Sequence, residues 1–170
     1  MPHPKLLSVR QQYQYACGYC GVTETAVGGE LTVDHYQPRS TGGGEDDDNL
    51  IYACVKCNLY KGEFWPDDED IMSERRVLHP ILDDWADHIR EDAQTGYLEA
   101  LTQTGQFHIA LLRLNRSQLV AHRLERRIYS ILQEKHQLLV RHNKELRKTI
   151  TAQEQYILML EAQLRNLSRS

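Results

Sequence analysis

The sequence predicts an α+β protein in three parts: a small zinc-stabilised module over residues 1–65, an extension of a small hairpin and a helix packing on it over residues 66–115, and a long basic helix over residues 116–170. Three observations lead to this prediction. Two Cys-x2-Cys pairs lie in the first part, apolar and polar residues alternate between them, and neither Gly nor Pro occurs after Gly105. Spaced cysteine pairs indicate a metal, alternation indicates strands, and a long stretch without helix breakers indicates a helix.

The four cysteines form the strongest motif. Cys17 and Cys20 make one pair, and Cys54 and Cys57 make the other. Two such pairs are typical of a zinc site, because each fits a tight turn or the first turn of a helix. Four sulfurs fill a tetrahedral shell, so we expect the ion to stabilise the fold and not to perform chemistry. Disulfides are the alternative, but the spacing and the lack of an apolar N-terminal leader favour thiolates in a reducing, cytoplasmic setting.

The segment between the pairs reads as a small hairpin followed by a helix. Residues 30–35 and 49–53 alternate in polarity and are rich in strand-forming residues, and a loop containing three consecutive glycines separates them. Residues 55–62 follow as a helix that ends at Gly62. A short N-terminal helix is expected within residues 5–16, because its apolar positions recur at helical intervals.

The order of residues in this segment resembles a known family. A Cys-x2-Cys pair is followed by a strand ending in Asp34 and His35, an acidic Gly-rich loop, Asn49, and a second pair with Asn58 directly after it. This pattern resembles the HNH endonucleases with a ββα-metal finger and a four-cysteine zinc site, of the bacterial type with a C-terminal extension. The resemblance implies metal-dependent hydrolysis of phosphodiester bonds in DNA, by nicking or, in a dimer, by double-strand cleavage.

The resemblance also implies residue roles. His35 would be the general base, Asp34 and Asn58 would bind a catalytic divalent ion, and Asn49 would brace the loop and orient the base. Imidazole suits a base near neutral pH, and oxygen ligands favour Mg²⁺ or Mn²⁺. Asn58 stands where many family members have His. The alternative function is a non-catalytic, zinc-stabilised DNA-binding or scaffolding subunit of a larger nucleic-acid-processing or defence complex.

The charge is distributed unevenly along the chain. The formal net charge is −4, yet residues 101–170 carry 12 basic and 5 acidic side chains. A phosphate backbone responds to such local charge, so DNA is the expected partner, with RNA not distinguished from it. A solvated helix face is the alternative explanation. The candidate phosphate contacts are Lys61, Arg116, Arg123 and Arg127. No apolar run approaches the length of a membrane span.

The sequence after Thr104 predicts two helices, over residues 105–113 and 117–167, with Thr104 and Asn115 as their possible N-caps. A heptad pattern runs through the second helix. Its d positions are Leu132, Leu139, Leu146, Gln153, Leu160 and Leu167, and its a positions are Tyr129, His136, Asn143, Ile150, Ile157 and Leu164. Ile at a with Leu at d favours a parallel two-stranded coil, so we expect a homodimer. The alternatives are a partner protein docking on the helix, or a helix folding back on its own chain.

Overall fold

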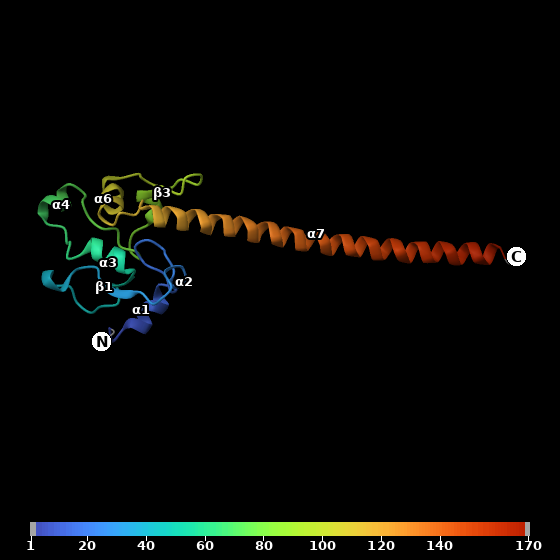
Figure 1. Cartoon of the computed structure of the whole chain (residues 1–170), viewed down its shortest axis with the longest axis horizontal. Helices are drawn as coiled ribbons and strands as arrows, with labels where there is room; N and C mark the ends of the chain where they lie inside the picture. Colours follow the sequence, from blue (N-terminus) through green and yellow to red (C-terminus); the bar gives the residue numbers. More distant parts are fainter. Residues whose placement is uncertain (1–2, 169–170) are drawn as a thin grey trace. The chain divides into compact units, whose positions relative to one another are not determined.

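The computed structural model describes residues 3–168 and has a mixed α+β fold, which confirms the predicted fold class (Figure 1). It contains two small two-stranded sheets and one long C-terminal helix. The chain divides into two units, Met1–Glu125 and Arg126–Ser170. The finer division into three parts at residues 65 and 115 stays a prediction.

The first half of the first unit is a finger of two strands and a helix, preceded by two short helices. Its elements are α1 (Leu6–Gln12), α2 (Glu24–Val27), β1 (Thr32–His35), the 3-10 helix η1 (Arg39–Thr41), β2 (Leu50–Ala53) and α3 (Val55–Lys61). β1 and β2 pair antiparallel, with Asp34 opposite Ile51 and His35 opposite Leu50. All four residues of β2 are buried, so β2 carries the finger's core while the end of β1 reaches the surface.

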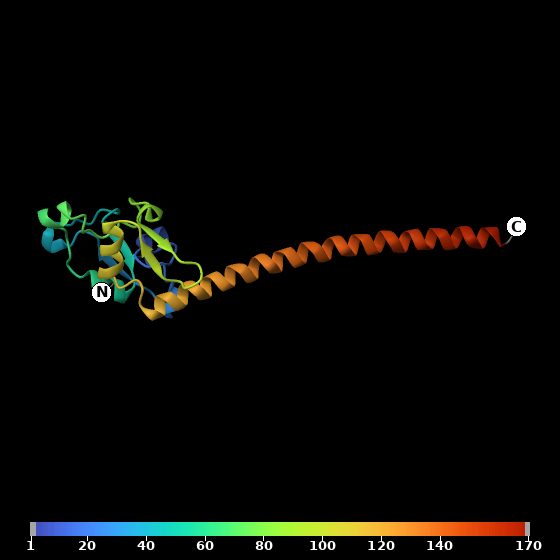
Figure 2. The same cartoon turned by 90° about the horizontal axis from the view of Figure 1, so that it is seen from above.

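The extension forms a second small layer. Its elements are α4 (Asp68–Met72), α5 (Trp85–His88), β3 (Ile89–Glu91), β4 (Leu98–Ala100) and α6 (Gln103–Leu111). β3 and β4 make the expected hairpin, and α6 contacts β4. Figure 2 shows α6 in yellow beside these strands. The finger and the extension share one core, in which Tyr19, Tyr52, Leu112 and Leu114 are fully buried.

The two predicted helix caps are wrong. Thr102, not Thr104, caps α6, because its Oγ1 accepts the Gly105 N–H at 3.1 Å. Thr104 instead donates its hydroxyl to the Glu74 carbonyl at 2.9 Å. Asn115 is not an N-cap either, since its side-chain amide bonds the backbone of Leu98 at 2.7 and 2.8 Å. Tertiary hydrogen bonds thus take the two side chains that the sequence offered as caps.

The final helix, α7 (Ser117–Leu167), is 51 residues long. Its first nine residues, 117–125, belong to the first unit and bury Leu119 and Arg123. Within the second unit, every side chain from 126 to 166 is exposed. At about 1.5 Å per residue the helix is about 76 Å long. In the part of the chain that the structure describes, no helix combines the length and apolarity that crossing a bilayer requires.

Candidate functional site

The four cysteines converge in the finger as predicted. Cys17 and Cys20 lie on a turn that closes at Gly21, whose φ of 71° favours glycine. Cys54 is the N-cap of α3, its sulfur accepting the Cys57 N–H at 3.5 Å. All four sulfurs lie within 4.8 Å of one another, and none forms a disulfide.

The sulfur spacing fits zinc. Zinc binds thiolate at about 2.3 Å, so two sulfurs at tetrahedral corners lie about 3.8 Å apart. The Cys20 and Cys54 sulfurs are 3.8 Å apart. Cys54 and Cys57 lie at the start of α3, directly after β2, and Cys17 and Cys20 lie on a turn that packs against the finger. The cluster therefore has the donor set and the spacing of a structural zinc site.

Arg116 is directed at this cluster. Its Nη2 lies 3.9 Å from the Cys54 sulfur and 3.7 Å from the Cys57 sulfur, while Nη1 donates to the Leu112 carbonyl at 3.0 Å. Four thiolates around one divalent ion carry a net charge of about −2, which a nearby guanidinium offsets. The guanidinium of Arg116 therefore faces the cysteine sulfurs, in place of the predicted contact with a phosphate.

A separate, open pocket of about 470 Å³ brings together three of the predicted site residues. Asp34 and His35 reach it from the end of β1, and Asn58 reaches it from α3. Arg39 and Glu63 line the same pocket. Asn58 donates its amide nitrogen to Thr32 Oγ1 at 3.2 Å. The hairpin register and the helix that follows it therefore gather a carboxylate, an imidazole and an amide at one surface hollow.

Asp34 is a buried carboxylate with two polar partners. It is only 7% exposed, and its Oδ2 accepts the Tyr19 hydroxyl at 2.7 Å and lies 3.3 Å from Lys61 Nζ. Burial raises the pKa of Asp34 above its ordinary value, while the neighbouring Lys61 charge opposes that rise. Both of these contacts are made by the same carboxylate oxygen, Oδ2.

Lys61 does not reach the surface, which corrects its predicted contact with phosphate. The residue is 2% exposed, and its Nζ donates to the His35 carbonyl at 2.7 Å. Burial lowers the pKa of Lys61, and the adjacent Asp34 carboxylate raises it. Lys61 therefore neutralises Asp34 and holds the end of β1.

His35 lies among charged neighbours that the sequence analysis did not single out. Its Nε2 is 2.9 Å from Glu45 Oε1 and 3.2 Å from Arg39 Nε. Glu45 also bonds His3 and Arg39. The hydrogen bond with His35, followed by those with His3 and Arg39, lowers the pKa of Glu45 to about 2. The acidic loop between His35 and Asn49 was the one available signal for Glu45.

Asn49 ties the two ends of the loop after β1 together. Its Oδ1 accepts the Gln37 N–H at 2.7 Å, and its Nδ2 donates to the Gly44 carbonyl at 2.8 Å. The loop is packed so tightly that a Cβ at Gly43 would lie 1.8 Å from the Gln37 carbonyl oxygen. The loop that carries Glu45 is thus held in one conformation beside His35.

The remaining predicted DNA contacts lie on α7. Arg123 is 4% exposed, and it donates to the carbonyls of Gly96 and Leu114 at 2.6 and 2.9 Å. Its predicted phosphate contact is therefore wrong, because its guanidinium is buried against backbone oxygens. Arg116, Leu119 and Arg123 share one helical face, which was the missed signal for burial. Arg127 is exposed in the second unit, and its contact with DNA stays a prediction.

Comparison with known proteins agrees with the motif. Residues 17–64 match the family model described as HNH endonuclease. Over 148 residues the chain is 28% identical to the Septu protein PtuA of Bacillus mycoides (strain KBAB4), in a match that covers 72% of this chain and 20% of that protein. The chain thus spans about a fifth of the length of this curated relative. No solved structure matches the chain significantly. Residues 17–64, with their clustered cysteines, belong to the HNH endonuclease family.

Proposed function

We propose that this protein is a metal-dependent endonuclease that hydrolyses phosphodiester bonds in DNA. The observation that carries the proposal is the open pocket lined by Asp34, His35 and Asn58 on the finger that matches the HNH family. A carboxylate, an imidazole and an amide at one hollow supply an ion ligand, a base and a second ligand.

Asp34 and Asn58 are the proposed ligands of a catalytic ion. Tyr19 and Lys61 engage one oxygen of Asp34, and Thr32 engages the amide nitrogen of Asn58, so each residue keeps an oxygen for a metal. These hard oxygen donors fit Mg²⁺ or Mn²⁺ better than a softer ion. When bound, such an ion supplies positive charge to the phosphate and to the leaving oxygen.

His35 is the proposed general base. It lines the pocket next to the ligand pair, and an imidazole with a free ring nitrogen can take a proton from water near neutral pH. Asn49 supports this role by fastening the loop that follows His35. The cysteine cluster would hold its zinc outside this chemistry, because four sulfurs leave no open coordination position.

The test is cleavage of supercoiled plasmid in Mg²⁺ or Mn²⁺ by the wild-type protein and by His35→Ala. We expect nicking by the wild type and its abolition in the variant, with unchanged zinc content and DNA affinity, since a base acts only in the chemical step. His142→Ala, which removes an exposed imidazole of the second unit, is the matched control. Asp34→Ala and Asn58→Ala should instead raise the divalent-ion concentration that cleavage requires.

The competing proposal, a non-catalytic DNA-binding or scaffolding subunit, predicts the opposite result. In that case wild type and His35→Ala would be equally inactive with every metal, on supercoiled, linear, single-stranded and branched DNA alike. The same panel with RNA substrates identifies the nucleic acid, because a 2′-hydroxyl is what lets a protein distinguish RNA from DNA.

We further propose that a second copy of the chain covers the apolar side of α7. The seam residues Leu132, Leu139, Ile150, Ile157 and Leu164 are between 52% and 66% exposed in the single chain. Ile at a positions and Leu at d positions suit a parallel pair of helices, and Asn143 at an a position fixes its register. Two fingers in one dimer would allow a cut in each strand of a duplex. Light scattering at micromolar concentration tests this, and a monomer would instead favour another protein as the partner of α7.

A further inference from the structure

We propose that Glu45 is a positioning residue for His35, whose carboxylate accepts the Nε2–H of His35 and thereby fixes Nδ1 as the nitrogen that takes the proton. The inference rests on the proposed role of His35 as the general base. Its starting point is the 2.9 Å contact between His35 Nε2 and Glu45 Oε1. A neutral imidazole has one N–H and one lone pair, so the partner of one nitrogen decides the role of the other.

The other oxygen of Glu45 has a definite donor. The Lys5 backbone N–H points at His3 Nδ1 at 3.2 Å, so in neutral His3 that nitrogen carries the lone pair. His3 therefore has its proton on Nε2, which lies 2.8 Å from Glu45 Oε2. The carboxylate of Glu45 is thus oriented by His3 on one side, and its Oε1 faces His35.

The proton on His35 follows from comparing its two contacts. Glu45 Oε1 can only accept a hydrogen bond, whereas Arg39 Nε, 3.2 Å from the same Nε2, can only donate one. Both bonds cannot form to one nitrogen of a neutral ring. The contact with the carboxylate is shorter and pairs a ring N–H with an anion, and Arg39 itself pairs with the same carboxylate. Nε2 is therefore the donor, and Nδ1 keeps the lone pair.

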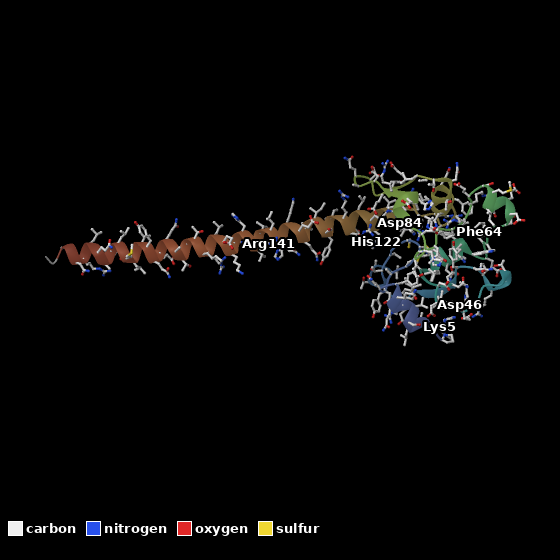
Figure 3. All side chains as sticks on the ribbon, turned by 180° about the vertical axis from the view of Figure 1, so that it is seen from behind. Lys5, Asp46, Phe64, Asp84, His122 and Arg141 are labelled. Carbon is white, nitrogen blue, oxygen red and sulfur yellow. The ribbon has the colours of Figure 1, made fainter. Side chains whose placement is uncertain are left out.

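The loop of Glu45 is anchored from both sides. Lys5 Nζ donates to the Glu45 carbonyl at 2.8 Å and to Asp47 Oδ1 at 2.7 Å. Figure 3 shows Lys5 and Asp46 close together on the same side of the first unit. His79 contacts the Asp48 carbonyl at 2.8 Å through its Nε2. The N-terminal segment and the extension thus hold the carboxylate in place before any substrate arrives.

The same three side chains invite another explanation, because ligand atoms of His3, His35 and Glu45 lie within 4.8 Å of one another, as in a metal site. The hydrogen bonds argue against it. The Lys5 N–H donates to His3 Nδ1, so the proton of a neutral His3 is on Nε2, where a metal would need a lone pair. A carboxylate accepting two N–H groups accounts for the cluster without an ion.

The arrangement has a chemical consequence. As His35 takes a proton from water on Nδ1, the ring becomes a cation, and an anion bonded to Nε2 stabilises that cation more than neutral water would. Hydrogen-bond partners that orient a metal-bound imidazole are worth about 10- to 100-fold in activity, and we expect a loss of the same order for an imidazole that acts as a base. Glu45 contacts the base and not the substrate, so DNA affinity should stay unchanged.

The experiment compares Glu45→Ala and Glu45→Gln with Asp46→Asn, which changes the charge of the same exposed loop by the same amount. Single-turnover cleavage by the zinc-loaded chain of residues 1–170 should slow about 10- to 100-fold in Glu45→Ala. It should slow less in Glu45→Gln, whose amide oxygen can still accept the N–H, and less than twofold in Asp46→Asn. In a His35→Ala background, Glu45→Ala should cause no further loss, because it acts only through His35.

Nitrogen chemical shifts of the His35 ring provide a readout that a merely structural role would not move. We expect a protonated Nε2 and a bare Nδ1 in the wild type, and a mixture of tautomers in Glu45→Ala. The inference would be overturned if Glu45→Ala cleaved DNA as fast as the wild type or faster. It would also be overturned by a proton on His35 Nδ1 in the wild type, or by a second zinc ion that is lost in His3→Ala. Undiminished cleavage by His35→Ala would instead refute the proposed function itself, so the two failures are distinguishable.

Discussion

The buried pair of Lys61 and Asp34 gives the sharpest test of the site's construction. Lys61→Met keeps most of the side-chain volume but removes the charge that lies 3.3 Å from Asp34 Oδ2 and the donor to the His35 carbonyl. Breaking a buried pair by removing one partner costs about 3–5 kcal/mol, because the other charge stays buried and unpaired. Against a total of about 5–15 kcal/mol for a typical domain, that is a large fraction. We therefore expect the melting temperature to fall by roughly 10–20 °C.

The assays are a thermal melt, which gives the melting temperature, and denaturant unfolding, which gives the free energy of unfolding, both in zinc-containing buffer. Lys56→Met, an exposed lysine of the same helix, is the control and should change the unfolding free energy by less than about 0.5 kcal/mol. Adding Asp34→Asn to Lys61→Met should recover part of the loss, since it removes the uncompensated charge. The reasoning fails if Lys61→Met unfolds like the wild type and instead lowers the salt dependence of DNA binding by about one phosphate contact.

Four further outcomes are expected. Cys57→Ser should lose both its zinc and its folded structure. A circular-dichroism melt that is unchanged after proven zinc removal would contradict a structural role for the metal. Arg116→Ala should release zinc to a chelator about 10- to 100-fold more readily, whereas Arg113→Ala, three residues earlier in the chain and exposed, should not. Burial lowers the pKa of His108 to about 3, so the unfolded state takes up its proton first. Stability should be full above about pH 6.5 and fall by up to about 1.4 kcal/mol per unit below it, and urea titrations should show a flatter slope between pH 6.5 and 5 for His108→Asn. Removal of residues 129–170 should give a zinc-bound monomer by light scattering that binds DNA more weakly and shifts from double-strand breaks to nicks.

The finger was predictable because its signals are local. Two residues between cysteines fix how a turn or a helix start presents sulfur, and alternation fixes a strand, so β1, β2 and α3 lie within two residues of their predicted bounds. Asp34 and Asn58 meet because a hairpin followed directly by a helix leaves few other arrangements. The order of the motif was therefore enough to place these residues at one pocket.

The exposure of the basic side chains was harder to predict, since a sequence shows which residues are charged but not which segments bury them. Lys61 follows Asn58 by one helical turn, yet its four-carbon stem reaches inward across β1 to Asp34. Arg123 sits in a run of exposed cations, but the turn at Gly96, distant in sequence, closes over it. Each burial is completed by contacts with segments 26 and 27 residues away in the sequence, and helical spacing alone does not say which segment that is.

The contact between Arg116 and the cysteine sulfurs connects the metal cluster to the start of α7. The guanidinium bonds the sulfurs and the Leu112 carbonyl at once, and Ser117 follows it as the first helical residue. Oxidation of the thiolates, which would eject zinc, would also remove the anion that holds this arginine. Amide hydrogens over residues 117–125 should then exchange with solvent together with those of the finger, while the amides further along the helix exchange by their own fraying. Oxidants that reach Cys20, the least buried of the four cysteines, would thereby lower the local stability of α7 over residues 117–125.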